Sequence, residues 1–506
     1  MSALTAQRRS IDLHALADRR EPLDVLVIGG GVTGCGAALD AASRGLSVAL
    51  VEANDLAFGT SRWSSKLVHG GLRYLASASI GIAYESAIER HHLMTTIAPH
   101  LVSPLRQVVP DFGDRRTKQL VWTGFRAGDA LRRVARTPKS VLPGPGNLSS
   151  EEMAAVTPTV ARAGLRGGVG TYDGQLVDDA RLVVGIARTA VAFGAHVCTY
   201  TKAGAVSGTG ATLTDTLTGE SFDVKARSVI NATGVWAGDV DSTLKIRPSR
   251  GTHLVFDAQA FGNPTAALTV PVAGSISRFV FAMPEQLGRV YLGLTDVDAP
   301  GAIPDVPTAD DDEIEFLLNT VNVALRQPLT RSDIRGTFSG LRPLIDSAGG
   351  EGGSLADVSR KHAVRVRDST LVSIVGGKLT TYRRMAQDAV DAAVGAAGLQ
   401  AGSCITAATP LVGATGGAPG SDLPPSLVAR FGTESSRVVS SATVPDPTAS
   451  IADGIDVTRA EIQYALTHEG ALTADDVIER RTRIGLIPED ASRVKHAVEE
   501  IVATAS

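Results

Sequence analysis

Residues 29–34, Gly-Gly-Gly-Val-Thr-Gly, have the spacing G-x-G-x-x-G, which is typical of backbone that approaches a pyrophosphate. In this pattern Gly29 permits a tight turn, Gly31 lets the backbone come close to a phosphate, and Gly34 lets a helix pack against the preceding strand. Glu52 follows 23 residues after Gly29, where a carboxylate can accept a hydrogen bond from a ribose hydroxyl. The spacing predicts a dinucleotide site; a glycine turn needed only for packing is the alternative.

Two polar loops far from this turn carry further candidate contacts to a cofactor. They are GTSRWSSKLVHGGLRYL at 59–75 and GGKLTTYRR at 376–384. The glycine turn does not choose between NAD and FAD, because both bind to this unit. A buried flavin ring needs polar contacts along its edge from sequence-distant loops, whereas an NAD(P)-linked enzyme would leave both loops without a purpose. The two loops therefore favour a flavin.

The elements that must position these residues begin with a β-α-β unit. An apolar strand is expected at 23–28, an alanine-rich helix at 35–43 and a second buried strand at 46–52. This order is typical of an α/β fold in which the glycine turn joins the first strand to the helix. Further elements are expected at 228–234 (strand), 278–284 and 288–296 (paired strands), and 382–397 (helix).

Composition excludes several other classes of protein. The chain of 506 residues is 43% hydrophobic and 20% charged, with a formal net charge of −4, so no global attraction to nucleic acid is expected. Its three cysteines form no CxxC pair, so the sequence implies neither a disulfide framework nor a metal site, and it fits a reducing cytoplasm. The N-terminus lacks an apolar signal region, and no run of about 18 apolar residues predicts a membrane span.

Segment 114–140 departs from this average because it is strongly basic. It holds eight Lys or Arg residues against two Asp, a net charge of +6, while the rest of the chain carries −10. A basic amphipathic stretch with aromatic residues can lie in a lipid interface, and a solvated helix face is the alternative. Gly124 and Gly128 weaken the expectation of a helix. The interleaved apolar residues are Trp122, Phe125, Leu131 and Val134.

Several sequence blocks together resemble the FAD-dependent glycerol-3-phosphate dehydrogenases. The most specific is FGTSRWSSKLVHGGLRYL at 58–75, and the combination covers the chain from about residue 22 to 500. Two residues depart from the family pattern: Trp63 replaces a small polar residue, and Lys361 a commonly acidic one. The other blocks, in chain order, are DGQLVDDARL (173–182), GTHLV (251–255), GLTD (293–296), SGLRPL (339–344), SRKH (359–362), GGKLTTYR (376–383) and the tail at 458–486.

The resemblance implies an α/β fold: a Rossmann-like FAD-binding domain, a mixed or antiparallel-sheet substrate domain and a helical C-terminal cap. We expect the FAD-binding domain to be discontinuous, with the substrate domain inserted in it and bearing the basic segment 114–140. The expected boundaries are 22–80, 151–245 and 363–397 for the FAD-binding domain, 81–150 and 246–362 for the substrate domain, 398–425 for a linker and 426–506 for the C-terminal domain.

The resemblance also implies roles for individual residues. His253 is expected to be the general base, Arg342 to stabilise the developing alkoxide, and Lys378 to stabilise the reduced flavin. A phosphate is best held by arginine forks, and the family places such residues around the substrate. The expected substrate contacts are Arg73, Tyr74, Arg342 and Arg360. The expected contacts to non-covalent FAD are Gly29, Gly31, Gly34, Glu52, Thr60, Ser61, Ser65, His69, Gly70, Gly234, Gly377, Lys378, Leu379 and Thr380.

The implied reaction is oxidation of sn-glycerol 3-phosphate to dihydroxyacetone phosphate, with hydride transfer to FAD and electrons passed to a membrane quinone. The family implies a cytoplasmic protein held peripherally on the inner face of the cell membrane, through an anionic surface. A flavin oxidase of a small amino or hydroxy acid, using oxygen, is the first alternative, and a non-catalytic FAD-binding sensor is a second. The oligomeric state is open, with a homodimer among the alternatives.

Overall fold

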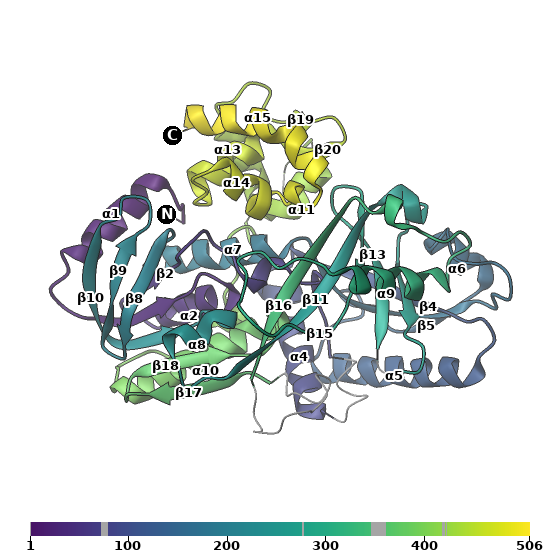
Figure 1. The fold of residues 1–506 in the computed structure, drawn as a ribbon, viewed down its shortest axis with the longest axis horizontal. Helices are drawn as coiled ribbons and strands as arrows, with labels where there is room; N and C mark the ends of the chain where they lie inside the picture. The colour runs from purple at the N-terminus through teal and green to yellow at the C-terminus, as the bar shows by residue number, and fades with distance from the viewer. Residues whose placement is uncertain are drawn as a thin grey trace.

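Two β-sheets lie side by side, and a helical C-terminal domain lies over them, at the top of the view in Figure 1. The computed structural model describes residues 2–71, 79–275, 278–345, 361–416, 420 and 422–505. The predicted α/β fold, with a Rossmann-like domain, a second sheet and a helical cap, is confirmed.

The first sheet has a parallel centre in which β1 lies between β10 and β2. β18, β10, β1, β2 and β7 run parallel, and β17 adds an antiparallel edge. Its strands, in spatial order, are β17 (Ala363–Arg367), β18 (Leu371–Val375), β10 (Ser221–Asn231), β1 (Leu23–Ile28), β2 (Val48–Val51) and β7 (His196–Cys198), with β8 (Thr201–Ser207) and β9 (Gly210–Asp215) extending from β10.

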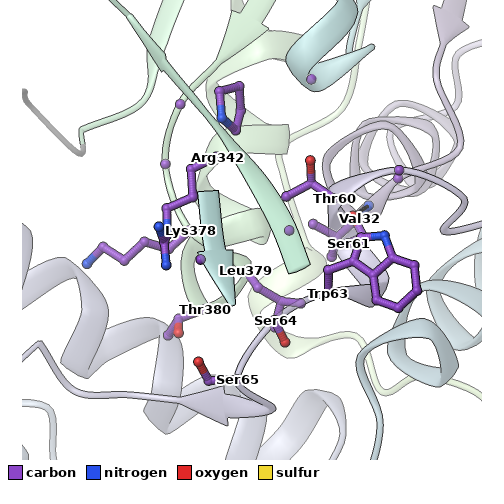
Figure 2. Close-up of a pocket in the computed structure, with 18 of the residues that line it drawn as sticks. Val32, Thr60, Ser61, Trp63, Ser64, Ser65, Arg342, Lys378, Leu379 and Thr380 are labelled. Atoms are coloured by element: carbon purple, nitrogen blue, oxygen red, sulfur yellow. Dashed lines mark hydrogen bonds between the residues drawn. The ribbon is translucent and has the colours of Figure 1, made fainter. Parts of the chain in front are cut away.

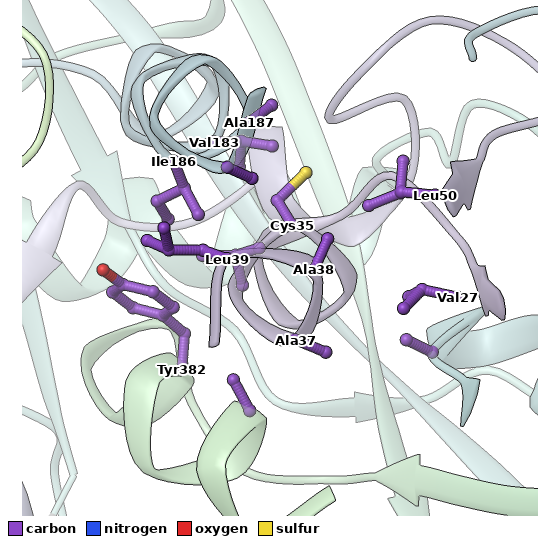
Figure 3. Packing of buried hydrophobic residues seen from close by; sticks show 14 of the residues in the cluster. Val27, Cys35, Ala37, Ala38, Leu39, Leu50, Val183, Ile186, Ala187 and Tyr382 are labelled. Atoms are coloured by element: carbon purple, nitrogen blue, oxygen red, sulfur yellow. The ribbon is translucent and has the colours of Figure 1, made fainter. Parts of the chain in front are cut away.

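Three helices cover one face of this sheet: α2 (Val32–Ser43), α7 (Asp179–Ala192) and α10 (Tyr382–Ala397). Small residues on α2 let these helices approach closely, since a Cβ on Gly36 would lie 3.0 Å from the ring of Tyr382. Figure 3 shows Leu39, Ile186 and Tyr382 meeting in the resulting apolar core. Helix α1 (Ala6–Ala17) and the β8–β9 hairpin cover the opposite face.

The second sheet is antiparallel except where β12 runs parallel to β4. Its long strand β11, near one edge of the sheet, pairs with β14, β15 and β16. The strands are β15 (Val297–Asp298), β11 (Ile246–Asp257), β14 (Arg289–Gly293), β13 (Phe279–Glu285), β12 (Ala267–Pro271), β4 (Val102–Pro110), β6 (Gly168–Leu176) and β3 (Leu67–Val68), with β16 (Gly336–Ile345) and β5 (Gly146–Leu148) at the sides. The helices around it are α4 (Ile80–His92), η2 (Leu93–Ile97), α5 (Arg115–Val134), α6 (Ser150–Val156) and α9 (Asp311–Asn322), whereas α8 (Ala237–Val240) lies beside the first sheet (Figure 1), where the Asn231 side-chain amide donates to the Ala237 carbonyl.

The C-terminal domain is mostly helical, and two capping boxes start its central helices. Thr458 and Glu461 cap α13, and Thr473 and Asp476 cap α14, as their spacing predicts. Its elements are α11 (Pro425–Phe431), η8 (Gly432–Glu434), α12 (Ser435–Ser440), β19 (Ser450–Ala452), β20 (Ile455–Thr458), α13 (Arg459–His468), α14 (Ala474–Asp476), η9 (Val477–Arg481), η10 (Ile484–Leu486) and α15 (Pro488–Ala505).

The strands predicted from short apolar patterns are present in the structure. β1 has the predicted bounds, and β13 pairs with β14 as expected. Helix α5 is a regular helix of 20 residues in spite of Gly124 and Gly128, and Asp114 caps its first turn.

The division into domains remains a proposal. Strands β3 and β6 fall within the stretches assigned to the FAD-binding domain, yet they pair in the second sheet. Within the stretch 398–425, predicted as a linker, residues 398–416 pack on the core of the first sheet near η7 (Thr406–Ala408), where Leu411 is buried and its N–H donates to the carbonyl of Ile97.

Candidate cofactor and active site

A cavity of about 940 Å³ lies between the two sheets and reaches the glycine turn at one end. Residues from both sheets and from the two polar loops line it, including Ser61, His253, Arg342 and Lys378. Figure 2 shows the labelled residues of both loops and Arg342 around this space. The volume lies within the range of ordinary cofactor and ligand pockets, roughly 300–1,000 Å³.

The glycine turn has the backbone geometry that its spacing predicts. Gly29 has φ +112°, and a Cβ there would lie 2.6 Å from the carbonyl oxygen of Ala232. A Cβ on Gly34 would lie 1.8 Å from the carbonyl oxygen of Gly29, so no larger residue fits at either position. Gly31 is the N-cap of α2 and supplies no side-chain cap, which leaves backbone N–H groups of the first turn to face a phosphate.

Glu52, at the end of β2, is tied to this turn. Its Oε2 accepts a hydrogen bond of 2.6 Å from the N–H of Gly30, and its Oε1 accepts one of 2.9 Å from the N–H of Asn54. Burial raises the pKa of Glu52, and these two backbone hydrogen bonds act in the opposite direction. Because the carboxylate also lines the cavity, it is placed to reach a ribose beside the turn.

The first polar loop crosses from the first sheet to the second. Thr60 Oγ1 donates to the carbonyl of Leu341 on β16 at 2.7 Å, and Ser61 Oγ accepts from the N–H of Val32 at 2.9 Å. Further along, Gly70 N–H donates to the Asp173 carboxylate at 3.0 Å. Thr60 and Ser61 line the cavity together with Ser65 and His69, the other predicted contacts of this loop.

His253 on β11 is buried and lines the cavity. Its Nε2 is hydrogen-bonded to Ser65 Oγ at 2.9 Å, and its ring stacks on Phe338 with centroids 4.6 Å apart. Burial lowers the pKa of His253 well below its ordinary 6.5, and the charges of Lys66 and Arg342 lower it further. The imidazole is therefore neutral near pH 7 and can accept a proton. Its Nδ1 has no hydrogen-bond partner within the described part of the chain.

Arg342 on β16 lies opposite Ser249 on β11, four residues along that strand from His253. Its Nη1 lies 3.3 Å from Asp296 Oδ1 and donates to Ser249 Oγ at 3.3 Å. A Cβ on Gly251 would lie 2.2 Å from its Nη2, so glycine at 251 makes room for the guanidinium. The guanidinium is thus oriented by acceptors on one side while it lines the cavity.

Lys378 lies in the second polar loop, directly before η6 (Leu379–Thr381). Its Nζ donates to Ser86 Oγ on α4 at 2.5 Å, and the residue lines the cavity with Gly377, Leu379 and Thr380. Gly234, which starts η3 (Gly234–Trp236), lines the same space. The structure therefore brings most of the predicted cofactor contacts to one cavity. Gly34 packs behind the turn, and Gly70 is held by Asp173.

Three predicted substrate contacts, Arg73, Tyr74 and Arg360, lie outside the described residues. Trp63, the departure noted above, is buried against Phe338 and lines the cavity.

Two buried ion pairs beside the cavity were not predicted from the sequence. Lys66 is buried in an ion pair of 2.7 Å with Asp179, and Arg90 pairs with Asp173 at 2.6 Å beside Gly70. Lys66, Asp173 and Asp179 lie inside the family-like blocks 58–75 and 173–182, whereas Arg90 lies outside every block. Membership of these blocks was the only feature of the sequence that could have pointed to the three residues.

The polar groups that line this cavity are of the kinds that bind FAD. The N-terminus of α2, where Gly31 supplies no side-chain cap and Ser61 occupies only the N–H of Val32, suits a pyrophosphate. Glu52 suits a ribose, and polar side chains of both loops line the wider space toward His253. Trp63 Nε1 is a buried donor with no hydrogen-bond partner in the ranges that the structure describes. This combination can hold a dinucleotide whose reactive ring lies near a neutral histidine and an arginine.

Comparisons with known proteins agree with this geometry. Residues 24–383 match the family model of FAD-dependent oxidoreductases, and residues 404–506 match the C-terminal domain of alpha-glycerophosphate oxidase. The chain is 58% identical to glycerol-3-phosphate dehydrogenase 1 of Mycobacterium tuberculosis, covering 99% of both chains. It is also similar to the structure of glycerol-3-phosphate dehydrogenase from Bacillus halodurans complexed with FAD. There the TM-score is 0.70 and the identity 25%, over 100% of this chain and 98% of the other.

Proposed function

Because the chain belongs to the family of FAD-dependent glycerol-3-phosphate dehydrogenases, we propose that it oxidises sn-glycerol 3-phosphate to dihydroxyacetone phosphate. The observation that carries the proposal is the meeting of His253, Arg342 and Lys378 in the cavity that contains the glycine turn. A neutral base and two cations are what oxidation of a phosphorylated alcohol requires.

Each residue has a distinct task in this proposal. Bound FAD supplies the hydride acceptor. His253 takes the proton of the substrate hydroxyl, which its lowered pKa allows at neutral pH. Arg342 stabilises the oxygen on which negative charge develops, and Lys378 places a positive charge beside the flavin. Arg73, Tyr74 and Arg360 complete the proposed hold on the substrate phosphate.

A comparison of two alcohols tests the proposed substrate class. With a water-soluble dye as acceptor, the purified protein should oxidise glycerol 3-phosphate, while kcat/KM for glycerol should be lower by at least about 30-fold. A charged group that loses its partner costs on the order of 2–5 kcal/mol, which corresponds to roughly 30- to 5000-fold. Equal rates with both alcohols would show that no phosphate clamp operates.

We also propose that the electrons leave to a membrane quinone and that α5 contacts an anionic membrane surface. Within the described ranges, no helix is both long and apolar enough to span a bilayer. Helix α5 instead exposes Arg126, Arg133, Leu120 and Val134, which combine charge with apolar surface. Its inner face also lines the cavity at Val121 and Phe125, so the proposed membrane contact lies beside the redox site.

A further inference from the structure

A short arginine-rich turn of the C-terminal domain, residues 480–483, is buried against the FAD-binding domain. Arg480, Arg481 and Arg483 are only 6%, 2% and 0% exposed. Buried arginines need partners, because an unpaired buried charge is costly. Several of their partners lie in other domains, in the two loops that follow β2 and that line the cofactor cavity.

Arg480 and Arg481 bind the first of these loops, residues 52–58, through Asp55. Arg481 Nη1 and Nη2 donate to the two carboxylate oxygens at 2.8 Å each, and Arg480 Nε donates to Oδ2 at 2.7 Å. Burial alone would raise the pKa of Asp55, yet the charges of Arg481 and Arg480 lower it. In this loop Glu52 and Asn54 line the cavity.

A chain of hydrogen bonds also joins the arginine-rich turn to the loop 52–58. Asp476 Oδ1 accepts hydrogen bonds from Arg480 Nη2 at 2.5 Å and from the hydroxyl of Tyr200 at 2.6 Å. The N–H of Tyr200 donates to the carbonyl of Asn54 at 2.7 Å. The loop is joined to the glycine turn as well, since Ala57 N–H donates to the carbonyl of Gly30 at 3.0 Å.

Arg483 binds the second loop, residues 59–66. Its Nη2 donates to the carbonyl of Arg62 at 2.6 Å, and its guanidinium lies 5.1 Å from the ring centroid of Trp63. Arg289 on β14 fixes the turn from the other side by donating to the carbonyl of Arg483 at 2.8 Å. One turn of the C-terminal domain therefore contacts residues 52–58 and residues 59–66, two of the segments that line the cofactor cavity.

We propose that residues 480–483 set the geometry of the two FAD-binding loops, so that docking of the C-terminal domain and binding of FAD are thermodynamically coupled. The arginines are positioning residues, since they act on the cofactor through Asp55, Arg62 and Trp63. The proposal rests on FAD binding and not on the identity of the substrate. It assigns the helical domain a task in the redox site, although none of its described residues lines the cavity.

The test compares two buried arginines of the C-terminal domain in the full-length protein. Arg481→Gln removes a contact to the cavity loop. Arg430→Gln is the matched control, because Arg430 is 3% exposed, pairs with Glu461 at 2.8 Å and with Asp456 in its own domain, and donates to Gln286 in the β13–β14 turn at 3.0 Å, and none of these partners lines the cavity. Apoprotein is titrated with FAD and followed by flavin fluorescence. Arg481→Gln should raise the Kd for FAD about 5- to 150-fold, the usual range for coupled sites, and Arg481→Lys by less. Arg430→Gln should leave this Kd unchanged.

Two results of the titration would overturn the proposal. One is an unchanged Kd in a folded Arg481→Gln protein. The other is an equal rise in both variants, because that would show general destabilisation of the domain.

Hydrogen exchange of the wild-type protein keeps the proposal testable if Arg481→Gln does not fold. Coupling is reciprocal, so FAD must stabilise the docked turn as the turn stabilises FAD binding. FAD added to apoprotein should slow amide exchange in 477–484 as well as at the glycine turn, while amides in 495–505 serve as the reference. Slower exchange at the glycine turn alone would contradict the coupling. Neither measurement uses glycerol 3-phosphate, so a wrong substrate assignment would leave both unaffected.

Discussion

At the scale of single residues, the pKa of His253 fixes the expected pH dependence of the reaction. A base must be neutral to accept a proton, and burial holds the pKa of His253 well below 6.5. The rate of flavin reduction should therefore rise with pH only below 6.5 and be level above it. His253→Ala should lower this rate by about 10²–10⁴ and abolish the rising limb. Single-turnover reduction at the wild-type rate in the variant would place the base elsewhere.

Arg342 can be tested separately from the cofactor. Arg342→Ala should lower kcat/KM for glycerol 3-phosphate by roughly 30- to 5000-fold, because a charged oxygen would lose its partner. FAD should stay bound, since Arg342 contacts Asp296, Ser249 and Thr295, which belong to the second sheet and the loop after β14. Gln at 342 is the size-matched control and should not restore activity. If Arg342→Ala keeps full activity, or loses FAD, its assigned role is wrong.

The residues that could be predicted from sequence are those whose role depends on local spacing. Gly29 and Gly34 were predictable because turn and helix geometry follow from neighbouring residues. The bond between Ser65 and His253 joins residues 188 positions apart, and the pair of Asp55 and Arg481 spans 426. No local pattern encodes such pairs, so only the family resemblance pointed to His253, and nothing pointed to Asp55.

At the scale of elements, helix α5 shows what a charge pattern predicts and what it misses. The charge of segment 114–140 suggested a surface for anionic lipid, and the structure adds which side chains can take part. Arg132 is buried in an ion pair of 2.7 Å with Asp129, whereas Arg126, Arg133 and Arg136 are exposed. Sequence alone could not separate these arginines, because their burial depends on how the helix packs.

The exposed arginines provide the test of the membrane proposal. Changing Arg126, Arg133 and Arg136 to Glu should release the protein from vesicles of anionic lipid and slow quinone reduction, yet spare activity with a soluble dye. Binding of the wild type should weaken with salt, because exposed charges are screened beyond about 10 Å at 0.1 M. The matched control reverses three exposed cations on other elements, Lys225, Arg227 and Lys495. If the α5 variant sediments with the vesicles as well as the wild type does, the exposed face of α5 contacts solvent and not lipid.

At the scale of the whole molecule, the cofactor cavity belongs to no single domain. Residues of the parallel sheet line it on one side, and residues of β11 and β16 line it on the other. Arginines of the C-terminal domain bind the loops 52–58 and 59–66, which also line it. Local patterns predicted the β-α-β unit around the glycine turn, and the family resemblance implied the α/β fold with its helical cap. The contacts between domains could not be predicted, since they depend on how the finished elements pack.

The central claim is that one cavity holds both FAD and a phosphorylated alcohol in reacting positions. Anaerobic addition of sn-glycerol 3-phosphate to the purified, FAD-loaded protein tests it most directly, with the flavin absorbance recorded in a stopped-flow instrument. The yellow absorbance should bleach within a turnover, whereas glycerol and small amino or hydroxy acids should leave it unchanged. Flavin that stays oxidised with glycerol 3-phosphate but bleaches with one of those acids would show that the proposed substrate is wrong.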